Sequence, residues 1–219
     1  MPRTSEPTAP ADPDIGEDLR DAEFPEGLSE AEISGSRIVA QSHASIDATA
    51  VRIADSRISD VDFADGEFAR CSIADVIWAG GTLANVRAMD SNLRRVRFSD
   101  VRATGLSFAG ATLEDVCFAA CRLDLTNLRM TKLERVRFEG CRMEEADFYQ
   151  ASLRSVVFDD CTLAGANWSG ATFERSEMRG SDLSGSDGLE SIRGVRMPWS
   201  DVVRSANEIA RAAGIEVIE

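Results

Sequence analysis

The chain has 219 residues, a formal net charge of -14 and a pI of about 4.6. Its length allows one domain with tails. Its acidity disfavours nonspecific binding to nucleic acid or to anionic membranes.

The acidic charge is unevenly placed along the chain. Residues 1–30 contain nine acidic and two basic residues, residues 31–185 contain 23 and 18, and residues 186–219 contain six and four. No stretch is apolar enough to span a bilayer, and the N-terminus lacks the apolar core of a signal peptide. The five cysteines are odd in number and show no disulfide spacing, so we expect a cytoplasmic protein in a reducing compartment.

Residues 1–30 form an acidic segment with four prolines among the first 13 residues. Such a segment has little apolar surface to offset the entropy lost on ordering, so we predict a disordered tail. Phe24, Pro25 and Leu28 are candidates for an N-terminal cap, because the open end of a stack of repeats needs cover.

Residues 31–185 repeat every five residues without insertion or deletion, which gives 31 consecutive pentapeptides. The third residue of each pentapeptide is large and apolar everywhere except at His43, Ala48, Ala88 and Ala103. A period of five is neither helical nor a simple strand alternation. It is an internal repeat, and the repeat predicts the fold.

Residues 20 apart in this region share a character, which indicates four pentapeptides per turn. One column of third residues is Ile38, Ile58, Trp78, Phe98, Phe118, Phe138, Phe158 and Met178. A column of first residues contains Cys121, Cys141 and Cys161. Such residues would stack at the strand spacing of about 4.8 Å and fill a solenoid core.

Three triplets show the small residue, polar residue and large apolar residue of this repeat: Ala146-Asp147-Phe148, Ala166-Asn167-Trp168 and Ser181-Asp182-Leu183. This pattern resembles the pentapeptide-repeat family over residues 31–185. The resemblance implies an all-β solenoid, a right-handed quadrilateral (four-sided) parallel β-helix of about eight coils. The first and third residues of each pentapeptide would point inward, and the rod would be about 37 Å long.

After residue 185 the repeat ends, and residues 186–219 are expected to cap the last coil with a short α-helix over about 200–213. Ser200 is the predicted N-cap and Gly214 the C-cap, and a short strand is expected at Ile215–Ile218. Some family members are similar in pairing through a C-terminal helix or strand, which makes this a possible homodimerisation segment. Its candidate residues are Trp199, Val202, Val203, Ile209, Ile215 and Val217.

The residue types that carry chemistry are interpreted as packing. His43 is the only histidine and falls at an inward position, and the stacked cysteines and Cys71 fall at the small inward position. Cys117 falls at an outward position and is a candidate modifiable thiol. No phosphate-binding loop, zinc spacing or nucleotide fingerprint is present. We therefore expect no enzyme activity, no catalytic residues, no metal and no cofactor.

The outward positions remain as candidates for a partner-binding surface. The side of the rod centred on His43 to Leu183 is the most acidic, with six acidic and three basic outward residues, although Arg102, Arg122 and Arg142 stack on it. Outward apolar residues occur on the neighbouring side. The candidate partner-binding residues are Asp62, Asp65, Asp124, Glu144, Glu145, Met89, Met130 and Tyr149.

The resemblance implies a non-catalytic protein-interaction module. The best-defined role in the family is binding to a type II topoisomerase, DNA gyrase especially, by proteins that resemble duplex DNA in width and acidity and modify the action of quinolones. A 37 Å duplex carries about 22 negative charges, whereas residues 31–185 have a net charge of only -5. The loops that some quinolone-resistance relatives insert between coils are missing here. The alternative is a structural scaffold that binds another protein through a flat face. In either case the expected partner is a protein, without direct binding to nucleic acid or membrane.

Overall fold

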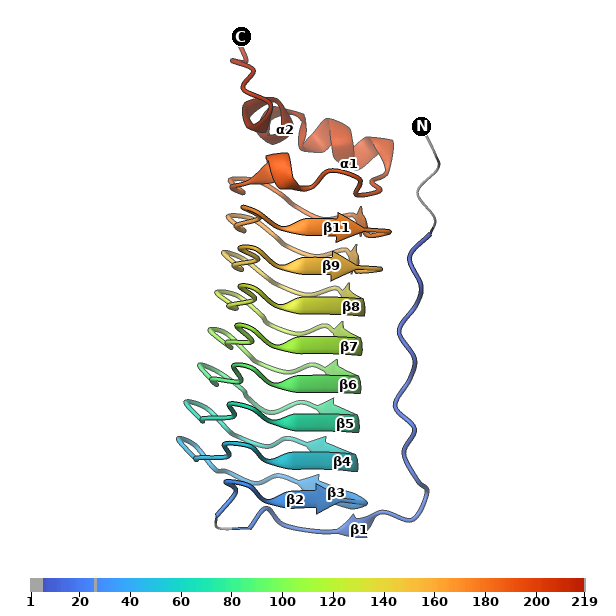
Figure 1. Cartoon of the computed structure of the whole chain (residues 1–219), viewed down its shortest axis with the longest axis vertical. Coiled ribbons are helices and arrows are strands. Elements are labelled where there is room, and N and C mark those ends of the chain that lie inside the picture. The colour runs from blue at the N-terminus through green and yellow to red at the C-terminus, as the bar shows by residue number, and fades with distance from the viewer. Residues whose placement is uncertain (1–5, 26, 219) are drawn as a thin grey trace.

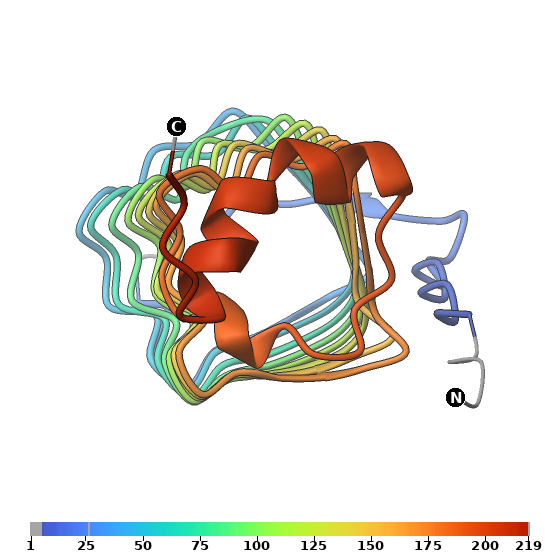
Figure 2. The ribbon, with the colours of Figure 1, turned by 90° about the horizontal axis from the view of Figure 1, so that it is seen from above.

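The computed structural model describes residues 6–25 and 27–218 and shows a rod of stacked coils (Figure 1). All paired strands are parallel and lie in one twelve-stranded sheet wound around the rod axis. Seen along that axis, the coils superpose as a four-sided outline (Figure 2). The predicted β-helix of about eight coils is confirmed.

Two adjoining sides of the coils carry the regular strands. Their bounds are β2 Glu32–Ser34, β3 Ser36–Val39, β4 Arg52–Ser59, β5 Ser72–Ala79, β6 Asn92–Ser99, β7 Thr112–Ala119, β8 Lys132–Glu139, β9 Ser152–Arg154, β10 Val157–Asp159, β11 Thr172–Glu174 and β12 Glu177–Arg179. The other two sides pair through isolated bridges such as Asp62 with Thr82. Partners in the register are 20 residues apart, for example Ile53 with Ile73, as four pentapeptides per coil require.

The core is built from the inward columns that the repeat predicts. The rings of Phe98, Phe118, Phe138 and Phe158 are stacked, with centroids 4.9 to 5.1 Å apart and planes within 6° of parallel. Ring spacing follows strand spacing because like residues occupy the same register position on successive coils. The inside and outside assignment of residues 31–185 therefore matches the structure.

Corners between the sides are made by the fifth residue of most pentapeptides, which adopts a positive φ, as at Asp75, Asn85 and Asp90. Asp, Asn and Gly tolerate this left-handed conformation best. The corner after β5 uses Gly80 and Gly81 together. A Cβ on Gly81 would lie 2.2 Å from the carbonyl oxygen of Val61 in the preceding coil, so only glycine fits there.

The N-terminal segment differs from the disordered tail that its composition predicts. Residues 6–25 run extended along the outside of the rod, from its C-terminal end to its N-terminal end (Figures 1 and 2). Strand β1, Arg20–Asp21, pairs parallel with β3 below the first coil. Docking to the side of the solenoid supplies the contacts that the segment cannot make within itself.

The N-terminal end of the stack is closed by the residues that follow β1. Phe24 and Leu28 are buried in the core cluster, whereas Pro25 is exposed. The Phe24 ring packs edge-on against His43 and Phe63, with centroids 5.7 and 4.9 Å away. These aromatic contacts cover the first coil.

The C-terminal end is closed by a 3-10 turn at Leu189–Ser191 and two short helices, α1 Trp199–Arg204 and α2 Ala206–Ala212. The single helix predicted over about 200–213 is thus interrupted at Ser205, and it starts after Pro198 without a side-chain N-cap at Ser200. The buried Asp201 carboxylate accepts a 2.7 Å hydrogen bond from the Gly180 amide, which anchors α1 to the last coil.

The strand predicted at Ile215–Ile218 is absent from the structure. Its place on the last coil is already taken, since the Met178 amide donates to the Arg196 carbonyl and the Arg196 amide donates to Ser176. Residues 215–218 are instead exposed beyond α2. Over the described residues, neither these helices nor any other has the length and apolarity to cross a membrane.

Candidate interaction surface

The interior cysteines are placed where thiol chemistry is suppressed. Cys71 is buried, its thiol lies 3.2 Å from the Ala48 carbonyl oxygen, and burial raises its pKa to about 11. Hydrogen bonding to the Cys141 thiol together with burial raises the pKa of Cys121 and Cys161. All are free thiols. The raised pKa makes Cys71, Cys121 and Cys161 poor nucleophiles, and the interior cysteines pack as small core residues.

His43 is half-buried beneath Phe24 and stacks on Phe63 at a centroid distance of 5.8 Å. Its Nε2 lies 3.1 Å from the Gln41 side-chain oxygen. Among residues 6–25 and 27–218, no group of three or more His, Cys, Asp or Glu side chains has the geometry to hold a metal ion. His43 therefore serves the N-terminal cap.

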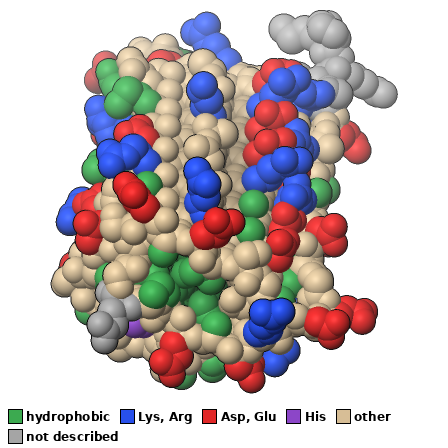
Figure 3. Space-filling view, turned by 60° about the horizontal axis from the view of Figure 1, so that its bottom comes forward, with side chains coloured by type: hydrophobic (Ala, Val, Ile, Leu, Met, Phe, Trp, Pro, Cys, Tyr) green, Lys and Arg blue, Asp and Glu red, His purple; other side chains and the backbone are tan. Residues whose placement is uncertain are grey.

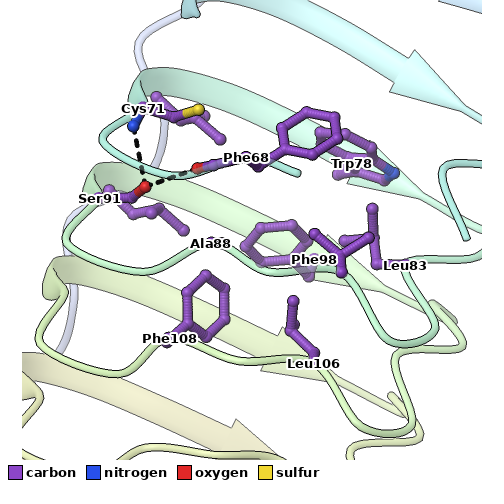
Figure 4. A pocket seen from close by; sticks show the side chains of 12 residues that line it. Phe68, Cys71, Trp78, Leu83, Ala88, Ser91, Phe98, Leu106 and Phe108 are labelled. Atoms are coloured by element: carbon purple, nitrogen blue, oxygen red, sulfur yellow. Dashed lines mark hydrogen bonds between the residues drawn. The ribbon is translucent and has the colours of Figure 1, made fainter. Parts of the chain in front are cut away.

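A cavity of about 30 Å³ lies inside the rod between the coils of β5 and β6 (Figure 4). Ala88 stands there between the larger Phe68 and Phe108, which occupy the same position one coil before and after. The Ser91 hydroxyl donates to the Phe68 carbonyl and accepts from the Cys71 amide, so it offers nothing to a ligand. This space has room for little more than water. It is a packing gap left by a small residue.

The outer surface carries a row of ion pairs along the edge where the side with β9 and β11 meets the side with β10 and β12. Two aspartates at corner positions, Asp75 and Asp115, are almost buried, and each is held by an arginine of the next coil. The Arg95 Nε lies 2.5 Å from Asp75 Oδ1, and the Arg135 Nε lies 2.7 Å from Asp115 Oδ1. We call these two pairs the carboxylate clamps.

Each carboxylate clamp also accepts a backbone hydrogen bond from the N-terminal segment. The Asp14 amide donates to Asp75 at 3.0 Å, and the Ala11 amide donates to Asp115 at 3.1 Å. The hydrogen bonds from Arg95 hold the pKa of Asp75 below its ordinary value. Burial would raise the pKa of Asp115, but the hydrogen bonds from Arg135 and Ala11 outweigh it and the pKa is lowered. Both carboxylates thus stay ionised.

Beside the clamps runs an outward column in which apolar and basic residues alternate from coil to coil: Ile77, Arg97, Cys117, Arg137 and Val157. We call the clamps and this column together the tail groove. Asp12 forms an ion pair with Arg97, and Glu6 lies 3.5 Å from Arg196 at the far end.

Cys117 is outward-pointing, as predicted, yet it is only 8% exposed. Tail residues flank Cys117 on both sides along the rod. Pro7 and Ala9 line a hollow with Arg137 and Val157, and Asp12 forms an ion pair with Arg97. Burial raises the pKa of Cys117. As long as the tail lies in the groove, this thiol is not the accessible modification site expected from its position.

The predicted acidic partner-binding residues lie on the side of the rod centred on His43 to Leu183, where arginines partly balance them. Asp124 Oδ2 and Glu144 Oε1 lie 3.7 and 3.2 Å from the Arg142 guanidinium. Asp65 and Glu145 are exposed at corners, and Asp62 accepts a hydrogen bond from the Ala64 amide. Figure 3 shows basic and acidic side chains following each other in columns along the rod.

The predicted apolar residues do not form one cluster. Met89 and Tyr149 are 60 residues apart, which is three coils or about 14 Å. Met130 is 55% exposed and lies one coil from Tyr149, whose carbonyl accepts its amide hydrogen bond. The Arg129 guanidinium lies 4.2 Å above the Tyr149 ring and 2.8 Å from Asp147. Only Met130 and Tyr149 are thus brought together.

The predicted dimerisation residues gather at the C-terminal end. Trp199, Val203, Ile215 and Val217 are exposed, with Trp199 at 78%. Val202 and Ile209 are half-buried.

The tail groove was not predicted. A signal for it exists in the sequence, because the corner residues 75, 95, 115 and 135 read Asp, Arg, Asp, Arg. Stacked at the strand spacing, such an alternation places an Asp–Arg pair on every second coil. That signal indicates the clamps but not their occupant.

Comparison with known proteins agrees with this architecture. The family model for the pentapeptide repeat region matches residues 91–168 and 111–187. The rod is a β-helix of the pentapeptide-repeat type, and residues 91–187 match the sequence model of that repeat. No curated protein matches the chain in sequence.

Two solved structures similar to the chain are those of QnrB1, described as a plasmid-mediated fluoroquinolone resistance protein. The full-length form has a TM-score of 0.57 at 18% identity, covering 90% of this chain and 100% of that one. A trypsin-treated variant has a TM-score of 0.55 at 19% identity, covering 91% and 100%. At these identities the likeness shows the fold.

Proposed function

We propose that the chain is a non-catalytic protein-interaction module of the cytoplasm that binds a type II topoisomerase, DNA gyrase, as a partial mimic of duplex DNA. In this role it modulates the enzyme or protects it from poisons. The likeness in fold to a fluoroquinolone resistance protein supports the choice of partner.

The observation that carries the proposal is the position of the acidic tail. Residues 31–185 alone have a net charge of -5, which is too little for a duplex mimic. Residues 6–25 add seven carboxylates and one arginine, and they lie along the length of the rod (Figure 1). Together the rod and tail carry about half of the roughly 22 charges of a 37 Å duplex.

The outward direction of these carboxylates supports the same role. Glu17, Asp18 and Glu23 are exposed. A line of exposed carboxylates beside a rigid rod attracts a basic surface and accelerates association. The proposed partner surface is therefore the one that the enzyme offers to DNA.

A homodimer through the C-terminal end would lengthen the mimic. The exposed Trp199, Val203 and Val217 supply the apolar surface that such an interface needs. We include this dimer in the proposal, with sedimentation of wild type and Trp199→Ala as its test. Dissociation of the variant at a concentration where the wild type is dimeric is the expected result, and two monomeric proteins would contradict it.

The test is a gyrase supercoiling assay with and without a quinolone. Micromolar protein should inhibit supercoiling or relieve the poison. A variant with Glu17→Gln, Asp18→Asn and Glu23→Gln should be weaker and less sensitive to salt, because it has three fewer charges on the tail.

The matched control neutralises three carboxylates near the C-terminal end of the rod with Asp187→Asn, Glu190→Gln and Glu208→Gln, and it should behave as the wild type. If the wild type neither inhibits supercoiling nor relieves the poison, the gyrase proposal is wrong. The scaffold alternative, with another protein partner, would then replace it.

A further inference from the structure

The two hydrogen bonds from the tail to the carboxylate clamps come from amides three residues apart. Ala11 and Asp14 donate their amides to Asp115 and Asp75, which lie two coils apart. Two coils span about 9.6 Å, and three residues of polyproline II helix span about 9.3 Å. In a β-strand two amides three residues apart would point to opposite sides. The tail therefore docks with the threefold period of polyproline II.

Burial along the tail has the same period. Pro7, Pro10 and Pro13 are half-buried, whereas most residues between them are exposed. Proline fixes φ near the polyproline II value and has no amide donor to leave unpaired. The prolines thus lower the entropy cost of docking, which is the cost that the acidic composition alone could not offset.

The period of the groove matches the period of the tail. Along the outward column an arginine recurs every second coil, at Arg97 and Arg137, and a carboxylate clamp also recurs every second coil. Two coils equal three tail residues. The triplet Pro10, Ala11 and Asp12 therefore places a half-buried proline, an amide on a clamp and a carboxylate on Arg97.

Two coils beyond Asp115, toward the C-terminal end of the rod, the corresponding clamp is incomplete. Corner position 155 is Ser155 where Asp75 and Asp115 stand in the clamps, and the Thr8 amide finds no acceptor among the described residues. The groove thus has two complete carboxylate clamps. The tail fills them with the amides of Ala11 and Asp14, each of which directly follows a proline.

From this match of periods we propose that the tail groove is a recognition site for extended peptides with proline at every third position and a carboxylate two residues after one of these prolines, as Asp12 follows Pro10. The occupant we commit to is such a segment of a partner protein. Residues 6–19 of the chain occupy the groove in cis and compete with that segment. This inference does not depend on gyrase being the partner.

The competition has a definite form. A tethered tail is present at an effective concentration of the order of millimolar. A free peptide of the same sequence therefore displaces it poorly, but it binds once the tail has lost its own affinity.

Cys117 reports on the groove because it lies in the outward column between Arg97 and Arg137, both of which are next to tail residues, while the other four cysteines are inside the rod. The experiment measures its labelling by a maleimide in the full chain. In an opened variant with Pro10→Gly, Asp12→Asn and Pro13→Gly, labelling should be at least about tenfold faster than in the wild type. A Cys117→Ala chain gives the background, and circular dichroism checks that the coils are intact.

A synthetic peptide with the sequence of residues 6–19 is then added to the opened variant. It should restore protection of Cys117, and a peptide with the three tail substitutions should not. Adding Asp75→Ala and Asp115→Ala to the opened variant should abolish protection by the wild-type peptide. Equal labelling of wild type and opened variant, or no protection by the wild-type peptide at millimolar concentration, would overturn the proposal.

Discussion

Replacing Phe118 by alanine tests the core in the middle of the rod. The Phe118 ring is 2% exposed and lies between Phe98 and Phe138, at centroid distances of 4.9 and 5.1 Å. Truncating a buried aromatic residue costs about 3–5 kcal/mol. We expect the upper part of that range, because the rings of Phe98 and Phe138 both lose a stacking contact and the parallel strands cannot move together to fill the cavity.

The assay is thermal and urea unfolding followed by far-UV circular dichroism. For a chain of this length, each kcal/mol lowers the Tm by roughly 2–4 °C, so Phe118→Ala should lower it by at least about 8 °C. Arg122→Ala, at an exposed position between Arg102 and Arg142, is the control and should change stability by less than about 0.5 kcal/mol. Equal and small effects at both positions would refute the inside and outside assignment.

Three further predictions concern the cavity, a corner and pH. Ala88→Val should stabilise the rod by about 0.5–2 kcal/mol by filling the cavity, whereas Ala103→Val, at a buried position outside it, should destabilise; urea midpoints of the two variants decide this. Gly81→Ala should cost about 1–3 kcal/mol, because φ is +75° and its Cβ would strike a backbone oxygen; a Tm equal to that of the wild type would contradict the corner geometry. The pKa values of Asp75 and Asp115 are lowered in the folded state, so the stabilisation is present above their ordinary value of 3.8 and is lost as pH falls through the lowered values. Maleimide labelling cannot follow this at low pH, but the Tm should fall more steeply below about pH 4 in the wild type than in Asp75→Ala plus Asp115→Ala.

The fold could be predicted because the five-residue period and the 20-residue recurrence indicate the same architecture. Period five places a small residue and a large apolar residue inward in each pentapeptide, and the recurrence at 20 residues puts Phe98 directly below Phe118. The structure shows both features. The same assignment predicts that His43 and Cys121 are packing residues, and the structure buries Cys121 and stacks His43 on Phe63.

The tail could not be placed from the sequence, because its stability comes from residues far along the chain. Ala11 is 104 residues from Asp115 and Asp14 is 61 from Asp75. Composition indicates how much apolar surface a segment can bury by itself. Here the side of the solenoid supplies the hydrogen-bond acceptors, Asp75 and Asp115. The burial of Cys117 follows from the same docking and therefore could not be predicted from the sequence either.

The C-terminal cap shows a second limit of prediction. An apolar stripe over 200–213 indicates helix, but the break at Ser205 and the absence of a strand at Ile215–Ile218 depend on what the last coil leaves free. The Arg196 backbone already pairs with that coil. Local patterns do not report such competition for one edge.

Amide hydrogen exchange in the tail, followed residue by residue by NMR at neutral pH, tests the docked tail most directly. Exchange at Ala11 and Asp14 should be slowed relative to Asp12 and Gly16, because only the first two amides donate to the carboxylate clamps. The slowing should disappear in the chain with Asp75→Ala and Asp115→Ala. Exchange at the rates of an unstructured peptide at all four amides of the wild type would contradict the docked tail and the groove that depends on it.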